Sequence, residues 1–421
     1  MPDIRKLSKK DYHAFADIAS GAYPGMGMNT EEKINDLAEW VAKKADSKFS
    51  CFYGLYKNKT LCGALILFDY QMNLFNHKVL CGGGGFLAVD LIHKKEHIAK
   101  DLCTFFLNHY RSRQAPFAAL YSFRPDFYKM MGAGYGTQVG VFRTNPKDLP
   151  SNGSKKYLKK LTKKDSSKFI KCFNNFADKK TGMFYDNLEN RENFFRHNKE
   201  SRFFGYEKDG ELLGYLSFKF VKQKPHVAGD FLHNEIHVTE MIYHTPEVLS
   251  AFLTLLHTQK DQVDTIQFTT HDKNFYFNLR DPRNDSTNVH YPVYHETHQS
   301  AVGMMYRLLN PKLLFTTLKS HSFGDISLRV KLDIRDSFLK INNKPIVVWF
   351  DNGLPSVKNS TAKYDVSLTI DTAEFTSLVL GAVDLKSLYN YNLAKLSNDK
   401  YLDVLHKLFY RDEKPVCLTQ F

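Results

Sequence analysis

An internal repeat runs through the first two thirds of the chain. The segment IRKLSKKD at Ile4–Asp11 returns as LKKLTKKD at Leu158–Asp165, an offset of 154 residues. FYGLYKNKTLCGAL at Phe52–Leu65 returns as FFGYEKDGELLGYL at Phe203–Leu216, an offset of 151 residues. Two chance matches would not keep their order and spacing in this way. The sequence therefore predicts a tandem duplication of a unit of about 150 residues, the size of one domain.

Each copy has the pattern of an α/β lobe. Ser8 and Thr162 are candidate N-caps, with Asp11 and Asp165 three residues on, a variant of the capping box. The second repeated segment predicts a hairpin of two apolar strands joined by KN or KDG. Beyond it, each copy has a strand followed by a helix with apolar residues at helical spacing. This order of helix, hairpin, strand and helix predicts a mixed α/β fold.

The pattern changes after LRDPRNDSTNVHYPVYHETHQS, residues 279–300. DISLRVKLDI and KYDVSLTI alternate apolar and polar residues, as strands with one buried face do. DTAEFTSLVLG predicts a helix with Asp371 as its N-cap and Gly381 at its end. SNDKYLDVLHKLFY predicts another helix, and PVCLTQF, residues 415–421, predicts a last short strand. The third domain is therefore expected to be α+β.

Composition narrows the function classes. The longest apolar run, LCGALILF, is far shorter than the roughly 20 residues of a membrane-spanning helix, and the N-terminus lacks the apolar core of a secretory signal. The six cysteines form no CxxC pair, as is typical of reduced thiols. We therefore expect a soluble, cytoplasmic protein with no membrane partner. The net charge of +13 makes nucleic acid a candidate partner, but the lysines are spread along the chain in small groups with acidic residues among them. This spread favours a generally basic surface and no nucleic-acid partner.

The stretch LAVDLIHKKEHIAKDL, Leu87–Leu102, predicts a strand that turns directly into a helix. The free N–H groups and positive dipole end of such a helix attract anions, and Lys94 and Lys95 add charge. No glycine stands in this turn, so a solvated helix start is the alternative. The same place in the second copy holds HTPE, with Pro246 and Glu247. This difference predicts one working site in the first copy and a structural second copy.

RPDFYKMMGAGYG, Arg124–Gly136, follows the predicted helix. The order of strand, basic turn, helix, strand and FY before a glycine-rich segment resembles that of GNAT acetyltransferases, which bind acetyl-coenzyme A (acetyl-CoA). The duplication, the α+β third domain and the terminal Phe421 resemble the Eis-like ("enhanced intracellular survival") branch of that superfamily. The resemblance implies two fused GNAT lobes, residues 1–150 and 151–288, and a sterol-carrier-protein-like domain, residues 289–421. The expected fold class is thus α/β and α+β.

The resemblance also implies site residues. Those along the acetyl-pantetheine arm of acetyl-CoA are Leu87, Ala88 and Val89. Those around its diphosphate are Lys94, Lys95, Glu96, His97, Ile98, Ala99 and Lys100, and those further along the cofactor are Phe123 and Arg124. Tyr128 would be the general acid and the carboxylate of Phe421 the general base. His97 stands where the family has glycine, and Gln420 adds no charge next to Phe421.

The expected reaction is direct acetyl transfer from acetyl-CoA to a primary amine, either aminoglycoside-like or lysine-type. No cysteine or serine lies in the motif, so no acyl-enzyme is expected. A tyrosine phenol, with a pKa of ~10, can protonate a leaving thiolate of comparable basicity. A free α-carboxyl, with a pKa of ~3.5, is a weak base for an ammonium group. It would act by attracting the cationic amine or by passing its proton to water. The resemblance further implies that the protein forms a homohexamer.

Other motifs predict less. HETH at His295–His298 lacks the spacing of HExxH, so no metal is expected. GGGG at Gly82–Gly85 lacks the spacing of a dinucleotide fingerprint and predicts a turn into the next strand. Trp40 is either a pocket wall or part of the core.

Two other functions stay open on the sequence. One is a non-catalytic oligomeric binding protein whose third domain carries an apolar ligand, which His97 and Gln420 favour. The other is a basic nucleic-acid binder, for which the sequence has no signature.

Overall fold

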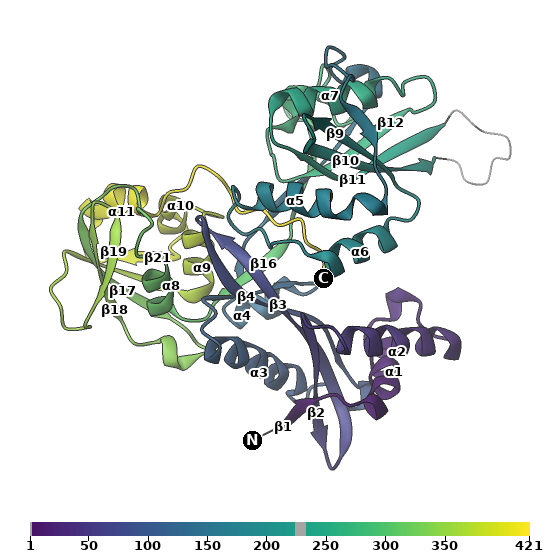
Figure 1. Ribbon diagram of the computed structural model, residues 1–421. Helices are drawn as coiled ribbons and strands as arrows, with labels where there is room; N and C mark the ends of the chain where they lie inside the picture. Colours follow the sequence, from purple (N-terminus) through teal and green to yellow (C-terminus); the bar gives the residue numbers. More distant parts are fainter. Residues whose placement is uncertain (1, 224–232) are drawn as a thin grey trace. The chain divides into compact units, whose positions relative to one another are not determined.

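The computed structural model describes residues 2–223 and 233–421, which form two compact units (Figure 1). One unit comprises residues 2–136, 304–414 and 420–421, and the other comprises the described residues of 137–303 together with 415–419. Within these residues no helix is both long and apolar enough to cross a membrane.

The first unit contains a seven-stranded sheet in the order β1-β2-β3-β4-β5-β16-β6. Its strands are β1 (Asp3–Lys6), β2 (Ser50–Lys57), β3 (Thr60–Leu74), β4 (His77–Val89), β5 (Phe117–Tyr121), β16 (Met304–Leu308) and β6 (Gly134–Tyr135). Only β4 and β5 pair in parallel. The helices of this lobe are α1 (Tyr12–Ala22), α2 (Glu31–Ala45), α3 (Ile98–Ser112) and α4 (Pro125–Met130).

Both faces of this sheet are covered by helices. Tyr53 of β2 packs against Phe105 of α3, while its neighbour Phe52 packs against Phe15 of α1 and Trp40 of α2. Neighbouring residues of a strand point to opposite faces, so α3 lies on one face and α1 and α2 lie on the other.

The second unit repeats this pattern in a sheet of order β15-β7-β12-β11-β10-β9-β8. Its strands are β7 (Gln138–Thr144), β8 (Leu158–Lys160), β9 (Arg202–Lys208), β10 (Glu211–Lys222), β11 (Asn234–Tyr243), β12 (Thr265–Thr270) and β15 (Gln299–Val302). Its helices are α5 (Ser166–Ala177), α6 (Leu188–His197) and α7 (Pro246–His257), and β13 (Val289–His290) and β14 (Tyr294–His295) form a separate hairpin. The predicted duplication is confirmed: β9–β10 repeats the hairpin β2–β3, and β11 and β12 repeat the parallel pair.

The predicted capping boxes are present in both lobes. The Asp11 carboxylate accepts a hydrogen bond from the Ser8 N–H at 2.9 Å, and Asp165 accepts one from the Thr162 N–H at 2.9 Å. Each box precedes a short 3₁₀ turn that continues into α1 or α5.

The strand pairing does not follow the predicted domain limits at residues 150 and 289. β7 lies before residue 150 yet pairs with β12 in the second sheet. β16 lies after residue 289 yet pairs with β5 and β6 in the first sheet. All five residues of β16 are buried and four of them are apolar, so this short run is the only signal that the sequence carries for the strand.

The third domain belongs to the first unit and has a five-stranded sheet of order β19-β18-β17-β20-β21. The strands are β17 (Leu328–Arg335), β18 (Ile346–Asp351), β19 (Leu354–Lys358), β20 (Val366–Asp371) and β21 (Ala394–Leu396). The helices are α8 (Pro311–Thr317), α9 (Thr372–Leu380), α10 (Leu385–Asn390) and α11 (Leu402–Phe409). As predicted, α9 follows Asp371 and ends at Gly381, whose φ of 85° is left-handed.

All nine residues of α9 are buried, because the helix lies between its own sheet and the first lobe. A Cβ on Gly134 of β6 would lie 2.1 Å from the Ala373 carbonyl oxygen, so only glycine fits at this approach. Five phenylalanine rings pack against one another in the interior of the third domain: Phe315, Phe323, Phe350, Phe375 and Phe409.

The predicted strand at 415–421 is wrong. This segment has no regular secondary structure. The Val416 N–H donates to the Thr181 carbonyl at 2.9 Å, and the Cys417 carbonyl lies 3.0 Å from the His271 Nε2. Single hydrogen bonds to separate residues hold the segment, and it does not form the regular hydrogen bonds of a paired strand. Pro415 also has no N–H with which to form such a bond.

Candidate active site

The two parallel strands of the first lobe diverge. Their pairing runs from Cys81↔Phe117 to Gly83↔Ala119 and stops there. β4 nevertheless continues to Val89 and β5 continues to Tyr121. Among the described residues, the end of β4, with Leu87, Ala88 and Val89, therefore has no ladder partner on its β5 side.

A bulge shapes the same end of β4. The register with β3 shifts between the pairs Ala64↔Ala88 and Ile66↔Gly85, and Phe86 has a φ of 44°. A bulge bends the strand and frees backbone groups from the ladder. The Leu87 carbonyl accepts a hydrogen bond from the Tyr23 hydroxyl at 2.7 Å.

The prediction of a turn at Gly82–Gly85 is wrong, because all four glycines lie inside β4. A Cβ on Gly82 would lie 2.1 Å from the Tyr110 ring, and one on Gly84 would lie 2.8 Å from the Phe106 ring. The glycines thus allow two aromatic side chains of α3 to lie directly on the strand.

A helix follows the strand, but β4 does not turn directly into α3: the turn from Asp90 to His97 connects them and includes a short 3₁₀ turn at Leu91–His93. Lys95 and His97 have φ values of 66° and 64°, in the left-handed region that glycine adopts most easily. His97 is the N-cap of α3, and its side chain makes no capping hydrogen bond. Within the described chain, nothing accepts from the N–H groups of Ile98 and Ala99. The helix start is therefore free to bind an anion although the turn contains no glycine.

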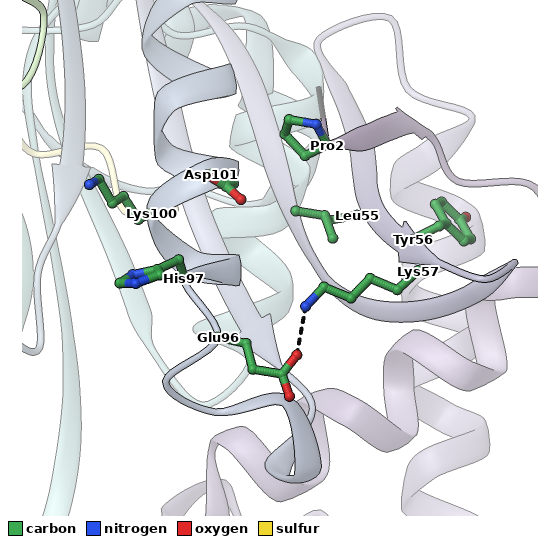
Figure 2. Close-up of a pocket in the computed structure, with 8 residues that line it drawn as sticks. All are labelled: Pro2, Leu55, Tyr56, Lys57, Glu96, His97, Lys100 and Asp101. Carbon is green, nitrogen blue, oxygen red and sulfur yellow. Dashed lines mark hydrogen bonds and ion pairs between the residues drawn. The ribbon is translucent and has the colours of Figure 1, made fainter.

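Glu96 is turned away from this helix start. Its Oε2 lies 2.6 Å from Lys57 Nζ and 3.1 Å from His93 Nδ1. The hydrogen bond from Lys57, followed by that from His93, lowers the pKa of Glu96. In Figure 2 the side chains of His97 and Lys100 point to one side of α3, and Glu96 points to the other, toward Lys57. These residues line a cavity of about 460 Å³ with Pro2, Leu55, Tyr56 and Asp101.

Tyr128 lies on α4, which begins with Pro125 at its first position. Its ring packs against the hydrophobic cluster that includes Ile98 and Ala133, and Leu87 and Val89 pack against the same cluster. No described residue forms a hydrogen bond with the hydroxyl of Tyr128. Burial raises the pKa of Tyr128 above the ordinary phenol value. A protonated hydroxyl without a partner is a suitable proton donor.

Phe123 and Arg124, which were predicted to contact the cofactor, lie on the surface before α4. The Phe123 side chain is 72% exposed. The Arg124 guanidinium forms two hydrogen bonds with Asp126, at 2.9 and 2.6 Å, and Lys94 and Lys95 are also exposed.

An aromatic cluster that the sequence reasoning missed lies beside the bulge. The ring of Tyr23 stacks on Phe86 with centroids 5.2 Å apart, and Trp40 meets the same ring edge-on at 5.6 Å. Tyr23 also contacts the exposed Phe123 at 6.0 Å. Burial raises the pKa of Tyr23 to about 12. Of this cluster only Trp40 carried a sequence signal, as one of two tryptophans in the chain.

Phe421 lies on the same sheet. Its ring is 4.9 Å from that of Tyr70, 5.2 Å from Phe68 and 5.6 Å from Tyr121. A Cβ on Gly85 would lie 3.8 Å from the Phe421 ring. The structure therefore brings Phe421 next to the point where β4 and β5 diverge, one residue before the bulge.

The second lobe is closed at the corresponding places. Only His244 and Thr245 connect β11 to α7, the Thr245 hydroxyl accepts from the Val248 N–H at 3.4 Å, and Pro246 has no N–H. In its interior Arg191, 2% exposed, forms ion pairs with Asp186 at 2.6 Å and Glu240 of β11 at 2.9 Å. Within the described residues no group of three or more His, Cys, Asp or Glu side chains could hold a metal ion.

Comparison with known families finds two domains of one kind followed by a third domain. Residues 3–136 match an acetyltransferase (GNAT) domain, residues 179–308 match a second acetyltransferase (GNAT) domain, and residues 316–418 match a sterol carrier protein domain. The chain is a tandem GNAT acyltransferase. The predicted architecture and fold class are confirmed, and GNAT domains generally use acetyl-CoA.

Solved structures share the fold of this GNAT chain over its whole length. A GCN5-related N-acetyltransferase from Anabaena variabilis is 13% identical with a TM-score of 0.80, and Eis1 from Mycobacterium abscessus is 15% identical with a TM-score of 0.77. A probable N-acyltransferase from Enterococcus faecalis is 15% identical with a TM-score of 0.78. Each comparison covers 100% of both chains. No curated protein sequence matches the chain.

Proposed function

We propose that this GNAT protein transfers an acetyl group from acetyl-CoA directly to a primary amine in its first lobe. The observation that carries the proposal is the contrast between the lobes. In the first lobe the start of α3 has no side-chain cap, and no described residue forms a hydrogen bond with the Tyr128 hydroxyl. In the second lobe the start of α7 is capped and Arg191 is buried among carboxylates.

The cofactor site follows from the backbone. The diphosphate binds the free N–H groups at the start of α3, where the helix dipole, Lys94, Lys95 and Lys100 attract negative charge. The pantetheine arm lies along Leu87, Ala88 and Val89, whose unpaired edge offers hydrogen bonds to its amides. Phe123 and Arg124 contact the cofactor beyond the diphosphate.

The reaction is a single displacement through a tetrahedral intermediate. The amine nitrogen attacks the thioester carbon, and a backbone N–H at the bulged end of β4 donates to the oxyanion. The C–S bond then breaks, and Tyr128 gives its proton to the leaving thiolate. The amine loses its proton to water near the Phe421 carboxylate, which attracts the cationic amine.

The acceptor is proposed to be aminoglycoside-like or lysine-type. The rings of Tyr23, Trp40, Phe86 and Phe421 beside the bulge suit a cationic amine, because aromatic faces attract ammonium groups. A cytoplasmic location, a homo-oligomer of six subunits and the absence of a nucleic-acid or membrane partner remain predictions.

The alternative of a non-catalytic carrier of apolar ligands is disfavoured by the third domain. Its interior is filled by the five phenylalanine rings that pack around α9. An apolar ligand would have to displace these rings.

Titration calorimetry with acetyl-CoA, followed by a thiol-release assay over a panel of amines, tests the proposal. We expect one cofactor per chain and thiol release that depends on the amine. Absence of binding would overturn the proposal. Two cofactors per chain would show that the second lobe is also open.

The left-handed turn makes a prediction at His97. His97→Gly is expected to keep the Kd of acetyl-CoA within about threefold, since glycine adopts the observed φ readily. His97→Val is expected to weaken binding about tenfold, because a β-branched residue resists this conformation by more than ~1 kcal/mol. Calorimetry measures both values. Equal losses in the two variants would mean that the imidazole itself binds the cofactor.

The role of Phe421 can be tested by extension. Adding Gly-Ser after Phe421 moves the carboxylate and is expected to lower kcat about 10- to 100-fold, the effect of a group misplaced by ~1 Å or more. Gln420→Ala keeps the carboxylate in place and serves as the matched control. Unchanged turnover in the extended chain would remove this carboxylate from the mechanism.

A further inference from the structure

The helix that carries Tyr128 is too short to be stable by itself. It spans six residues, and isolated helices below about 12 residues are marginal in water. Two of its last carbonyls are satisfied locally: that of Tyr128 accepts from the Ala133 N–H at 3.0 Å, and that of Lys129 accepts from the Gly132 N–H at 2.8 Å. The carbonyl of Met131, the C-cap residue, has a distant partner.

That partner is Arg307 of β16, which is 1% exposed. Its Nε donates to the Met131 carbonyl at 2.8 Å. Its Nη1 donates to the Thr372 hydroxyl at 2.8 Å, and its Nη2 donates to Asp336 at 2.6 Å. Arg307 thus joins the end of α4 to two residues of the third domain.

Asp336 is held in turn by its own domain. Its carboxylate accepts from the Leu339 N–H at 2.7 Å and from Asn342 Nδ2 at 2.9 Å. With these bonds the carboxylate has a fixed position, and the guanidinium fork that it binds is fixed with it.

A second contact ties α4 to the same domain. Lys129 Nζ lies 3.0 Å from the Glu374 carboxylate of α9. A Cβ on Gly132, where φ is 82°, would lie 2.5 Å from Thr372 Cγ2. The chain after α4 therefore approaches α9 as closely as a glycine allows.

We propose that Arg307 is a positioning residue for the Tyr128 hydroxyl, and that the third domain serves the reaction by holding Arg307. This rests on the proposed function, in which Tyr128 is the general acid. The hydroxyl has no hydrogen bond within the described residues to orient it, so its place depends on the position of α4. A displacement of ~1 Å at a reacting group costs about 100-fold in rate.

The test uses Arg307→Lys, which keeps a cation beside Asp336 but cannot bond Met131, Thr372 and Asp336 together. We expect kcat per correctly folded protein to fall about 10- to 100-fold. The folded fraction is measured by acetyl-CoA titration, and Kd should stay within about twofold because the cofactor contacts lie on β4 and α3. In the Tyr128→Phe background the same change should lower the residual rate by less than about twofold.

Each outcome decides one point. Equal losses of rate in the two backgrounds, or full activity of Arg307→Lys, would overturn the positioning role. Full activity of Tyr128→Phe alone would overturn the acid assignment of the proposed function instead.

A control variant separates positioning from general loss of structure. Arg191→Lys in the second lobe removes a guanidinium that is equally buried and bonds to Asp186, Glu240 and Tyr215. It should leave kcat per folded protein unchanged. If Arg307→Lys does not fold, Thr372→Val removes one of the bonds and should lower kcat, while Thr372→Ser should restore it. Equal kcat in these two variants would overturn the proposal.

Discussion

Replacing Tyr128 by phenylalanine is expected to lower kcat by about 10²- to 10⁴-fold, the usual contribution of general acid catalysis. The ring of Tyr128 packs against the cluster that includes Ile98 and Ala133, and phenylalanine preserves that packing. Only the hydroxyl is lost, and it has no hydrogen bond within the described residues. The Kd of acetyl-CoA should therefore stay within about twofold, measured by calorimetry beside single-turnover rates. A rate close to that of the wild type would assign the proton to another donor.

The pH dependence of the wild type supplies a control. Burial raises the pKa of Tyr128, so its proton is lost only above the ordinary phenol value of about 10. We expect no alkaline fall of kcat between neutral pH and about pH 10. The same shift means that the folded state holds this proton more tightly than the unfolded state. This stabilisation of the folded state is fully present below the pKa that Tyr128 has in the unfolded chain. It is lost as the pH rises from there through the higher pKa of Tyr128 in the folded state. A decline of kcat near pH 8 would indicate a different acid.

Asp336→Ala is expected to lower the free energy of unfolding of the first unit by about 3–5 kcal/mol, because it leaves the Arg307 guanidinium buried and unpaired. Both tryptophans, Trp40 and Trp349, belong to this unit, so urea denaturation followed by tryptophan fluorescence reports on it alone. Three hydrogen bonds to the carboxylate, from Phe338, Leu339 and Asn342, are lost as well.

Asp403→Ala is the matched control for that measurement. Asp403 pairs with Lys386 at 2.6 Å, the same distance as Asp336 to Arg307, but its side chain is 76% exposed. Exposed ion pairs contribute little to stability because water screens them, so a small loss is expected. Similar losses in the two variants would contradict the effect of burial argued here.

The parts of the fold that were predictable are those with local signals. Ser8 with Asp11 and Thr162 with Asp165 mark the first helices, and the hairpins have turn residues between apolar strands. The repeat of these signals gave the duplication without any knowledge of strand pairing.

The parts that were missed depend on contacts between distant segments. The glycines at 82–85 have the composition of a turn, and only the approach of Tyr110 and Phe106 explains their place in a strand. The neighbours of β16 in the sheet cannot be deduced from four apolar residues and an arginine. Within the site, the sequence pointed to the turn before α3 and to Tyr128. It carried no signal for Arg307, because an arginine in a short strand has the same pattern whether it is exposed or buried.

The position of β16 between β5 and β6 also affects how the chain can fold while it is being translated. Domains commonly fold in turn as they leave the ribosome, the N-terminal one first. Here the lobe that is translated first needs residues 304–308 to complete its sheet, so β5 keeps an open edge while the whole second lobe is made. Open strand edges invite association with other chains. A premature stop codon between the lobes would therefore release a product that contains Tyr128 and the turn before α3 but cannot complete the sheet that supports them.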